Sequence, residues 1–399
     1  MQLPSRKRLF SIGVAALAAI PLAILGPAAP SGAASSAGST AKSCATPAKG
    51  QASCQALVRT DLVQAQAISP NATPSGYGPS SLQSAYNLPS ATAGSGRTVA
   101  IVDAYDDPTA EADLAVYRSQ FGLPACTTAN GCFKKIDQNG GTTYPKKDGG
   151  WAEEISLDLD MVSAICPNCH ILLVEAKTPS FANLGAAVNR AAATAGVVAI
   201  SNSYGGSDAS DASYGSYYNH PGIAVTASSG DSGYGASYPA SSHYVTAVGG
   251  TTLSSASNSR GWTETAWSGA GSGCSAYNTA LTGASSFGTG CSKRAEADVS
   301  AVANPSTGVA VYDSTAYQGY VGWMVFGGTS VSSPVIASVY ALAGNTGSID
   351  NNYPYTHSSS LWDVTSGSNG SCTTSQWCTA RTGWDGPTGL GTPNGIGAF

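Results

Sequence analysis

The segment from Trp151 to Val162 carries two carboxyl side chains, Glu154 and Asp158, that are four residues apart. In a helix this spacing puts both on one face, about one turn from each other. Two like charges there destabilise an isolated helix, but two carboxyls can share a proton, so that one pKa rises and the other falls. A glutamate whose pKa is raised in this way can act as a general base toward a serine in acid.

A solvated acidic face is the ordinary meaning of such a helical run. Here the segment is otherwise apolar, and Ala164-Ile165 and an apolar stretch follow it, as in a buried helix. Glu153 and Asp160 are further carboxyls in the segment, but neither has a carboxyl four residues away. We therefore assign the chemistry to Glu154 and Asp158.

A serine lies at the entry of a predicted helix. The stretch 327–334 reads Gly-Gly-Thr-Ser-Val-Ser-Ser-Pro, contains Ser330, and leads into the apolar helical segment 335–343. Glycines let a substrate backbone approach closely, and a helix N-terminus stabilises negative charge near the hydroxyl. We expect Pro334 in the first helical turn, which has no intrahelical donor to lose. The position suits a nucleophile, although an ordinary N-cap serine has the same pattern.

The elements that must position these side chains alternate along the chain. Apolar runs predict strands at 97–102, 170–175, 197–201, 223–228 and 244–248, and helical spacing is found at 108–121, 153–165 and 184–195. Nearly continuous apolar runs are typical of buried parallel strands. We expect an α/β fold with a doubly wound, mostly parallel sheet flanked by helices in a single catalytic domain. Ligands would lie beyond the carboxyl ends of the strands.

The motif around Ser330 resembles that of subtilisins and sedolisins, in which Gly-Thr-Ser is followed by three residues and then by proline. Subtilisins also need a histidine in a His-Gly-Thr context. That context is absent around the four histidines, which are His170, His220, His243 and His357. The pair Glu154-x-x-x-Asp158 is similar to the sedolisin motif. This resemblance to the sedolisins implies a subtilisin-like fold, with Ser330 as nucleophile, Glu154 as base and Asp158 as the residue that orients the base.

The same resemblance gives roles to loops that are otherwise ordinary turns. The loop 227–233 contains the sedolisin sequence Gly-Asp-Ser-Gly, so a protonated Asp231 would donate a hydrogen bond to the oxyanion, which favours acid. The segment 201–206 matches the family's binding segment for substrate backbone, with Tyr204 where sedolisins commonly have Trp. Asp103 occupies the subtilisin aspartate position, where we expect it to support the site or to shape a loop.

Two aspartates near the C-terminus flank glycine-rich turns. Carboxylates and main-chain carbonyls are ligands that Ca²⁺ prefers, although capping aspartates of a surface turn have the same appearance. Sedolisins carry a Ca²⁺ site in matching segments. The resemblance therefore implies one structural ion, with ligands from Asp363, Val364, Arg381, Gly383 and Asp385.

Residues 1–35 predict an export signal, because a basic start at 6–8 precedes an apolar run at 9–25 and small residues follow. A single membrane anchor is the alternative, but the run is short and Pro21 interrupts it. We interpret residues 36–75 as an N-terminal arm or short pro-segment, and 76–399 as the peptidase domain. Sedolisins usually have a long folded prosegment, whereas only about forty residues separate the predicted signal from the domain here.

Ten cysteines in an exported chain predict disulfides. Pairing between nearest neighbours would join Cys44 with Cys54, Cys126 with Cys132, Cys166 with Cys169, Cys274 with Cys291, and Cys372 with Cys378, although sequence alone leaves the connectivity open. The run Cys166 to His170 also matches the attachment pattern of haem c, and Cys-x-x-Cys can be redox-active. A short disulfide explains the pair more simply.

Only 10% of the residues are charged, and the net charge of −5 becomes about −8 without residues 1–35. This argues against nucleic acid as a partner. We expect a secreted, extracellular, monomeric endopeptidase that acts on proteins or peptides at acidic pH and leaves the membrane after signal removal. Two alternatives remain at this stage, namely a catalytically silent module that keeps the fold, and a subtilisin-like enzyme with a distant histidine.

Overall fold

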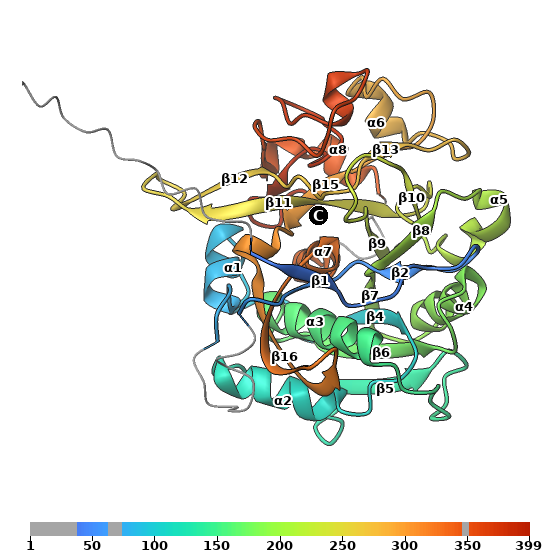
Figure 1. Ribbon diagram of the computed structural model, residues 1–399, viewed down its shortest axis with the longest axis vertical. Helices are drawn as coiled ribbons and strands as arrows, with labels where there is room; N and C mark the ends of the chain where they lie inside the picture. Colours follow the sequence, from blue (N-terminus) through green and yellow to red (C-terminus); the bar gives the residue numbers. More distant parts are fainter. Residues whose placement is uncertain (1–37, 63–73, 345–350) are drawn as a thin grey trace, which may run out of the picture. The chain divides into compact units, whose positions relative to one another are not determined.

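The apolar runs form the buried strands of one large sheet (Figure 1). The computed structural model describes residues 38–62, 74–344 and 351–399, so the predicted signal at 1–35 lies outside the described residues. The strand order is β12-β11-β9-β7-β4-β6-β5, with β15 also paired to β11, and every pair except β11–β12 is parallel. The bounds are Thr98–Ala104 (β4), Phe133–Asp137 (β5), His170–Ala176 (β6), Val197–Asn202 (β7), Ala224–Ser228 (β9), Thr246–Ser255 (β11), Trp262–Ala266 (β12) and Val299–Val302 (β15). The predicted mostly parallel sheet is confirmed.

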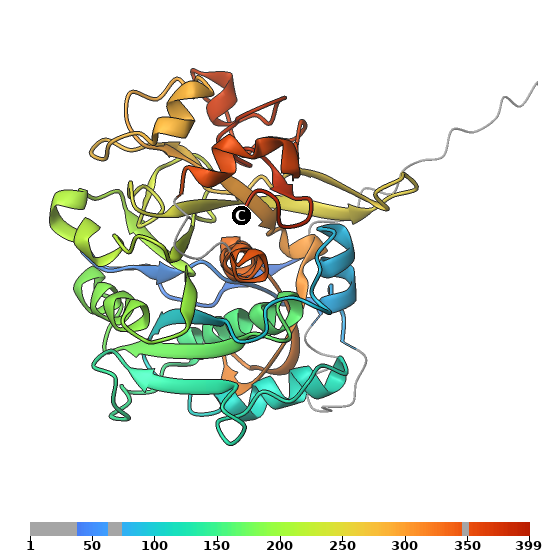
Figure 2. The same cartoon turned by 180° about the vertical axis from the view of Figure 1, so that it is seen from behind.

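Helices α3 (Gly149–Ile165) and α7 (Thr329–Ala343) pack against each other and against the middle strands. Helix α3 begins at Asp148, whose side chain accepts a hydrogen bond from Trp151 N–H at 3.2 Å. Its residues are buried from Gly150 on, as the apolar sequence predicts. Figures 1 and 2 show α7 nearly end-on in the middle of the view, between β11 and β1.

The remaining helices cover the outer parts of the same unit. They are α1 (Pro79–Ala85), α2 (Ala110–Gln120), α4 (Phe181–Ala192), α5 (Asp211–Tyr214), α6 (Thr282–Ser286) and α8 (Tyr353–Thr356). Helix α2 packs against α3, and α4 packs against β4 and β6. Within the described ranges, no helix is both long enough and apolar enough to cross a bilayer.

Pro334 lies in the second turn of α7, because the helix already begins at Thr329. The expectation of a first-turn position is therefore wrong. A proline here has no N–H to donate to the carbonyl four residues earlier, which belongs to Ser330. Ser203 Oγ lies 3.4 Å from that carbonyl oxygen. The proline thus interrupts the hydrogen-bond ladder of α7 at the carbonyl of the predicted nucleophile.

The N-terminal arm is built into the fold as three short strands, β1 (Thr40–Lys42), β2 (Ser53–Cys54) and β3 (Leu57–Arg59). They complete two further sheets, in the orders β1-β3-β17-β16 and β10-β8-β2. The partner strands are β8 (Tyr204–Ser207), β10 (Ser237–Tyr238), β16 (Val309–Tyr317) and β17 (Tyr320–Gly327), and two small ladders pair β13 (Gly273–Cys274) with β14 (Ala295–Glu296) and β18 (Leu361–Trp362) with β19 (Thr392–Pro393). The arm, blue in Figure 1, crosses the middle of the view past α7 and belongs to the compact unit Gly38–Phe399.

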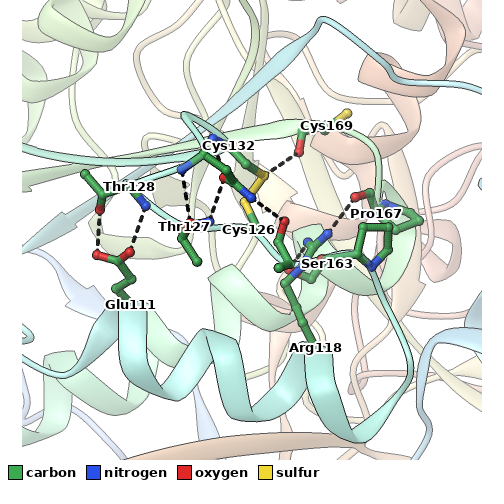
Figure 3. The surroundings of a disulfide bond; sticks show 12 residues. Glu111, Arg118, Cys126, Thr127, Thr128, Cys132, Ser163, Pro167 and Cys169 are labelled. Carbon is green, nitrogen blue, oxygen red and sulfur yellow. Dashed lines mark hydrogen bonds between the residues drawn. A yellow bond between two sulfur atoms is a disulfide. The ribbon is translucent and has the colours of Figure 1, made fainter.

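The five disulfides join the nearest-neighbour cysteines, which confirms that pairing. Figure 3 shows the Cys126–Cys132 bridge beside Arg118, which reaches from α2. The Arg118 guanidinium is buried and donates to Ser163 Oγ at 2.9 Å and to the Pro167 carbonyl at 2.7 Å. The polar side chain thus fixes the end of α3 and the turn that follows it. Cys166 and Cys169, in that turn, are bonded to each other.

Candidate active site

Ser330 is the second residue of α7 and lies in its first turn, after Gly327, which ends β17, and the N-cap residue Gly328. Its side chain is fully buried, and Oγ donates a hydrogen bond to Glu154 Oε2 at 2.8 Å. The next nearest acceptor is the Ser203 carbonyl, 3.1 Å away. The structure therefore brings the predicted nucleophile and the predicted base into direct contact.

Glu154 and Asp158 project from one face of α3, as their spacing predicts, and both are fully buried. Asp158 Oδ1 accepts a hydrogen bond from Ser203 Oγ at 2.8 Å. Among the described residues, Glu154 Oε1 and Asp158 Oδ2 are both buried and lack a hydrogen-bond donor. A proton held between the two carboxyls would satisfy both atoms.

Asp103 adds a third carboxyl to this cluster from the carboxyl end of β4. It is fully buried, both its oxygens lack a donor within the described chain, and burial raises its pKa to about 8. The pKa of Glu154 is raised by burial first, then by the charges of Asp158 and Asp103. The pKa of Asp158 is raised by burial and by Asp103. The cluster therefore strongly disfavours full ionisation, and Asp103 is electrically part of the site.

Asp231 lies in the loop after β9 and contacts Thr329, the residue before Ser330. Its Oδ1 accepts hydrogen bonds from Thr329 N–H at 2.7 Å and Thr329 Oγ1 at 2.9 Å. Its Oδ2 is buried without a partner in the described residues. Burial raises the pKa of Asp231 to about 7, against the opposing effect of the Thr329 bonds. Oδ2 is thus the atom that can carry a proton and donate it in a hydrogen bond.

The absence of a side chain at Gly328 lets the Gln55 backbone and the Asp231 carboxyl approach closely beside the nucleophile. Its φ of 96° is in the left-handed region that favours glycine. A Cβ at Gly328 would lie 2.6 Å from Asp231 Oδ2 and 2.1 Å from the carbonyl oxygen of Gln55. Asp231 Oδ2 and the Gln55 carbonyl therefore face the same side of Gly328, where the Ser330 N–H also points. This corner has the donor arrangement of an oxyanion site.

The Gln55 backbone occupies this corner, which the sequence interpretation missed. Ser330 N–H donates to the Gln55 carbonyl at 3.1 Å, while Gln55 N–H donates to Ser330 Oγ at 3.0 Å and lies 3.2 Å from the Ser203 carbonyl. Alternate residues of the arm are buried from Ala52 to Val58, which is the period of a strand. That alternation was a usable signal for a strand, but nothing in it identified the partner.

The segment 201–206 borders the same corner. Tyr204 is fully buried, its hydroxyl donates to Asn202 Oδ1 at 2.7 Å, and its ring lies 6.5 Å from the ring of Trp151. Its main chain forms β8, which pairs with β2 of the arm. A cavity of about 280 Å³ opens beside Gln55, and residues of 205–207 and 229–233 line it.

The histidines lie away from Ser330. His170 begins β6 and pairs with Thr98 at the start of β4, whereas Asp103 lies near the other end of β4. The rings of the other three hydrogen-bond main-chain carbonyls, with the pairs His220–Tyr217, His243–Thr279 and His357–Tyr353. None of the four contacts Ser330 by a hydrogen bond within the described residues. The geometry gives no support to a histidine base.

The predicted calcium ligands come from two neighbouring loops. Gly383 N–H donates to Asp363 Oδ2 at 2.9 Å, and Arg381 N–H donates to Asp385 Oδ2 at 3.1 Å. The pKa of Asp385 is raised to about 7, chiefly by burial and with a smaller contribution from the charge of Asp363. Among the described residues, no group of three or more His, Cys, Asp or Glu side chains is placed so that it could hold a metal ion. An ion here would need main-chain carbonyls beside the two carboxylates, which is a donor set that Ca²⁺ accepts.

Comparison with known proteins relates this geometry to a family. Residues 141–358 match the model of the subtilase family. Kumamolisin from Bacillus sp. (strain MN-32) is 29% identical over 376 aligned positions, and sedolisin from Pseudomonas sp. (strain 101) is 33% identical over 176. The matches cover 83% and 40% of this chain, but only 64% of kumamolisin and 29% of sedolisin. The chain thus spans less than two thirds of each curated relative.

Solved structures give the same comparison in three dimensions. Pseudomonas sedolisin, a serine-carboxyl proteinase complexed with two molecules of pseudo-iodotyrostatin, aligns with a TM-score of 0.66 at 26% identity. The alignment covers 81% of this chain and 96% of that one. The S41 psychrophilic protease aligns with a TM-score of 0.52 at 18% identity, over 80% of this chain and 98% of that one, which shows a shared fold alone.

The buried Asp103 generates a prediction about stability. Because its pKa is about 8 when folded and about 4 when unfolded, the folded state retains the proton over that window. The free energy of unfolding should therefore be highest near pH 4 and fall as pH rises toward 8. In a Ser330→Ala background, Asp103→Asn should flatten this slope by up to about 1.4 kcal/mol per pH unit. Urea unfolding between pH 4 and 8 measures it.

The exposed carboxyl of Asp61 supplies the control. In the same Ser330→Ala background, Asp61→Asn should not change the slope of the free energy of unfolding against pH between pH 5 and 8. Equal slopes for Asp103→Asn and Asp61→Asn would contradict the assignment of Asp103 to the acid cluster.

Proposed function

We propose that this chain, which belongs to the subtilase family and to its sedolisin type, hydrolyses peptide bonds of proteins with Ser330 as nucleophile and Glu154 as general base. The observation that carries the proposal is the 2.8 Å hydrogen bond between Ser330 Oγ and Glu154 Oε2 in a fully buried pair. A serine hydroxyl is a weak nucleophile until a positioned base takes its proton. No histidine is available for that task in the described site, and Glu154 is.

In the proposed reaction, Ser330 Oγ attacks the carbonyl carbon of the scissile bond while its proton passes to Glu154 Oε2. The carbonyl oxygen becomes an oxyanion, which accepts hydrogen bonds from Ser330 N–H and from protonated Asp231. Glu154 then gives the proton to the leaving amine, and the acyl group stays on Ser330 as an ester. Water repeats the sequence, with Glu154 as its base, and releases the acid.

Asp158 and Asp103 raise the pKa of Glu154, which favours its uptake of the serine proton. A single proton between Glu154 Oε1 and Asp158 Oδ2 leaves Oε2 free to accept the serine proton. The Ser203 hydroxyl holds Asp158 at Oδ1 and so fixes the orientation of the pair. Since Asp231 must be protonated to donate and its pKa is about 7, the proposed activity belongs to acidic solution.

The proposal includes an exported, monomeric enzyme with one structural calcium ion. The basic, apolar and small-residue regions of 1–35 support export, and the five disulfides suit an oxidising compartment. For the ion, the carboxylates would come from Asp363 and Asp385, and the carbonyls from Val364, Arg381 and Gly383. When bound, Ca²⁺ would hold the two C-terminal loops together and neutralise the two adjoining carboxyls.

The catalytic pair is tested by substitution with matched controls. Ser330→Ala and Glu154→Gln should each lower the rate on a denatured protein substrate at pH 4 by at least about 10³-fold, because each removes a partner of the proton transfer. Ser338→Ala, a buried serine of the same helix, and Glu153→Gln, the adjacent buried carboxyl, should each retain the rate within about twofold. Full activity in Ser330→Ala would rule out the proposed chemistry.

The oxyanion role of Asp231 is tested by the pH dependence of kcat/KM. The wild-type rate should fall as pH rises through about 7, because Asp231 then loses the proton it must donate. Asp231→Asn keeps an N–H donor at every pH, so the fall near pH 7 should disappear, although the maximal rate is lower. Ser232→Ala, an exposed neighbour in the loop, should keep the wild-type profile. An unchanged fall in Asp231→Asn would exclude this role.

The calcium proposal is tested by thermal unfolding. Saturating Ca²⁺ should raise the Tm over that in excess chelator by roughly 5 °C, because a ligand bound only by the folded state stabilises it. Asp385→Asn should abolish the difference, while Asp211→Asn should preserve it. The same Tm in calcium and in chelator would refute the site.

A further inference from the structure

The arm passes through the active site in the position of a peptide substrate. On one side of Ser330, β2 pairs antiparallel with β8, with Ser53 opposite Gly205 and Cys54 opposite Tyr204. On the other side, β3 pairs antiparallel with the end of β17, with Leu57 opposite Gly327. An extended peptide that adds a strand to a sheet edge is bound in this way, by main-chain hydrogen bonds along its length.

The register of the arm identifies one peptide bond at the reacting position. The Gln55 carbonyl oxygen accepts from Ser330 N–H at 3.1 Å and faces the same side of Gly328 as Asp231 Oδ2. The Gln55 N–H lies 3.2 Å from the Ser203 carbonyl, which continues the ladder with β8. The carbonyl in the oxyanion corner is thus that of Gln55, and the bond that follows it is Gln55–Ala56.

We propose that Gln55–Ala56 is a self-cleavage site and that residues 40–59 form a built-in reactive loop that occupies the chain's own active site. This rests on the proposed function. Ser330 Oγ adds to the Gln55 carbonyl carbon, the Ala56 nitrogen leaves with the proton that Glu154 carries, and an ester forms. Water then supplies a hydroxyl to Gln55 and a proton to Ser330. The products are a carboxylate at Gln55 and an amine at Ala56.

Three contacts brace the loop on both sides of this bond. Strand β1 pairs antiparallel with β3, so that Lys42 lies opposite Leu57. Ser43 N–H donates to the Ala56 carbonyl at 3.1 Å. The Cys44–Cys54 disulfide closes the upstream part of the loop immediately before Gln55. After cleavage, the upstream piece remains paired with the downstream piece, so the cut ends stay near the site and compete with other substrates for it.

The same register identifies the pocket that holds the Gln55 side chain, on the amino side of the Gln55–Ala56 bond. The Gln55 carboxamide lies against Gly205, where an added Cβ would come within 3.2 Å of Gln55 Nε2 and 2.3 Å of Ser237 Oγ. Glycines and serines line most of the adjoining cavity. An uncharged polar side chain such as glutamine can be accommodated there.

The cleavage site is tested on the full chain by N-terminal sequencing and intact mass after incubation at pH 4. The wild type should acquire a new terminus at Ala56, and Ser330→Ala should not. A first cut at another bond of the arm, no cut in an active wild type, or an Ala56 terminus in Ser330→Ala would overturn the proposal.

The brace is tested by removing one disulfide at a time. Cys44→Ser with Cys54→Ser should raise the initial rate on an added denatured protein at least about tenfold, because a loop released from its closure competes less well for the site. Cys126→Ser with Cys132→Ser removes a bridge of similar loop length beside Arg118 (Figure 3), and its rate should stay within about twofold of wild type. Equal rates in the two double variants would overturn the proposed role of the Cys44–Cys54 disulfide in holding the arm.

A readout without activity separates this proposal from the peptidase proposal. In Ser330→Ala, the amide hydrogens of 53–59 should exchange slowly, and the Cys44/Cys54 double variant in that background should lose the protection at least about tenfold. Fast exchange in Ser330→Ala overturns the bound arm even if the wild type is an active peptidase. A second outcome is slow exchange of these amides together with no hydrolysis by any folded variant at any pH. That outcome would mean that the arm occupies the site, but it would overturn both the cleavage of the arm and the proposed function.

Discussion

The hydrogen bond from Ser330 Oγ to Glu154 Oε2 joins side chains that are 176 residues apart in the chain. Both are fully buried, so their distance depends on how α3 packs against α7 and not on any local turn. Protein interiors are dense and resist small displacements, which makes this packing a precise positioning device. Asp158, one turn further along α3, is placed by the same helix contact, and Ser203, between β7 and β8, lies within 2.8 Å of Asp158 Oδ1 and 3.4 Å of the Ser330 carbonyl oxygen.

A second constraint follows from the burial that this packing creates. A carboxyl withdrawn from water favours its neutral form, and a neighbouring carboxylate strengthens that preference. The raised pKa values of Asp103, Glu154, Asp158 and Asp231 all have burial as their largest cause. The proposed catalysis requires a protonated Asp231 and a single proton on the Glu154–Asp158 pair. Acid supplies the proton on Asp231 and keeps Asp103 neutral, so the fold and the proposed chemistry favour the same pH range.

The sequence predicted the parts of the site that obey a local period. The four-residue spacing of Glu154 and Asp158 follows from helix geometry, and the apolar runs around 98–102 and 171–174 follow from burial in a parallel sheet. The electrical role of Asp103 did not emerge, because it depends on the register that sets the end of β4 beside α3. The arm was assigned only as a segment, because alternation from Ala52 to Val58 predicts a strand but not its partner. Pro334 was misplaced because the helix begins six residues before the predicted apolar segment.

Occupancy of the site and protonation of its carboxyls are linked. The Gln55 backbone lies directly against Ser330 and beside Asp231. The bound arm therefore contributes to the burial that raises the pKa values of Asp231 and of Glu154, the partner of Ser330. A bound segment that favours protonation is itself bound more tightly by the protonated site, because linkage is reciprocal. The proton that prepares Asp231 to stabilise an oxyanion therefore also strengthens the hold on the arm. On this argument acid alone does not release the arm, and the β1–β3 pairing and the Cys44–Cys54 disulfide are contacts that hold it in place.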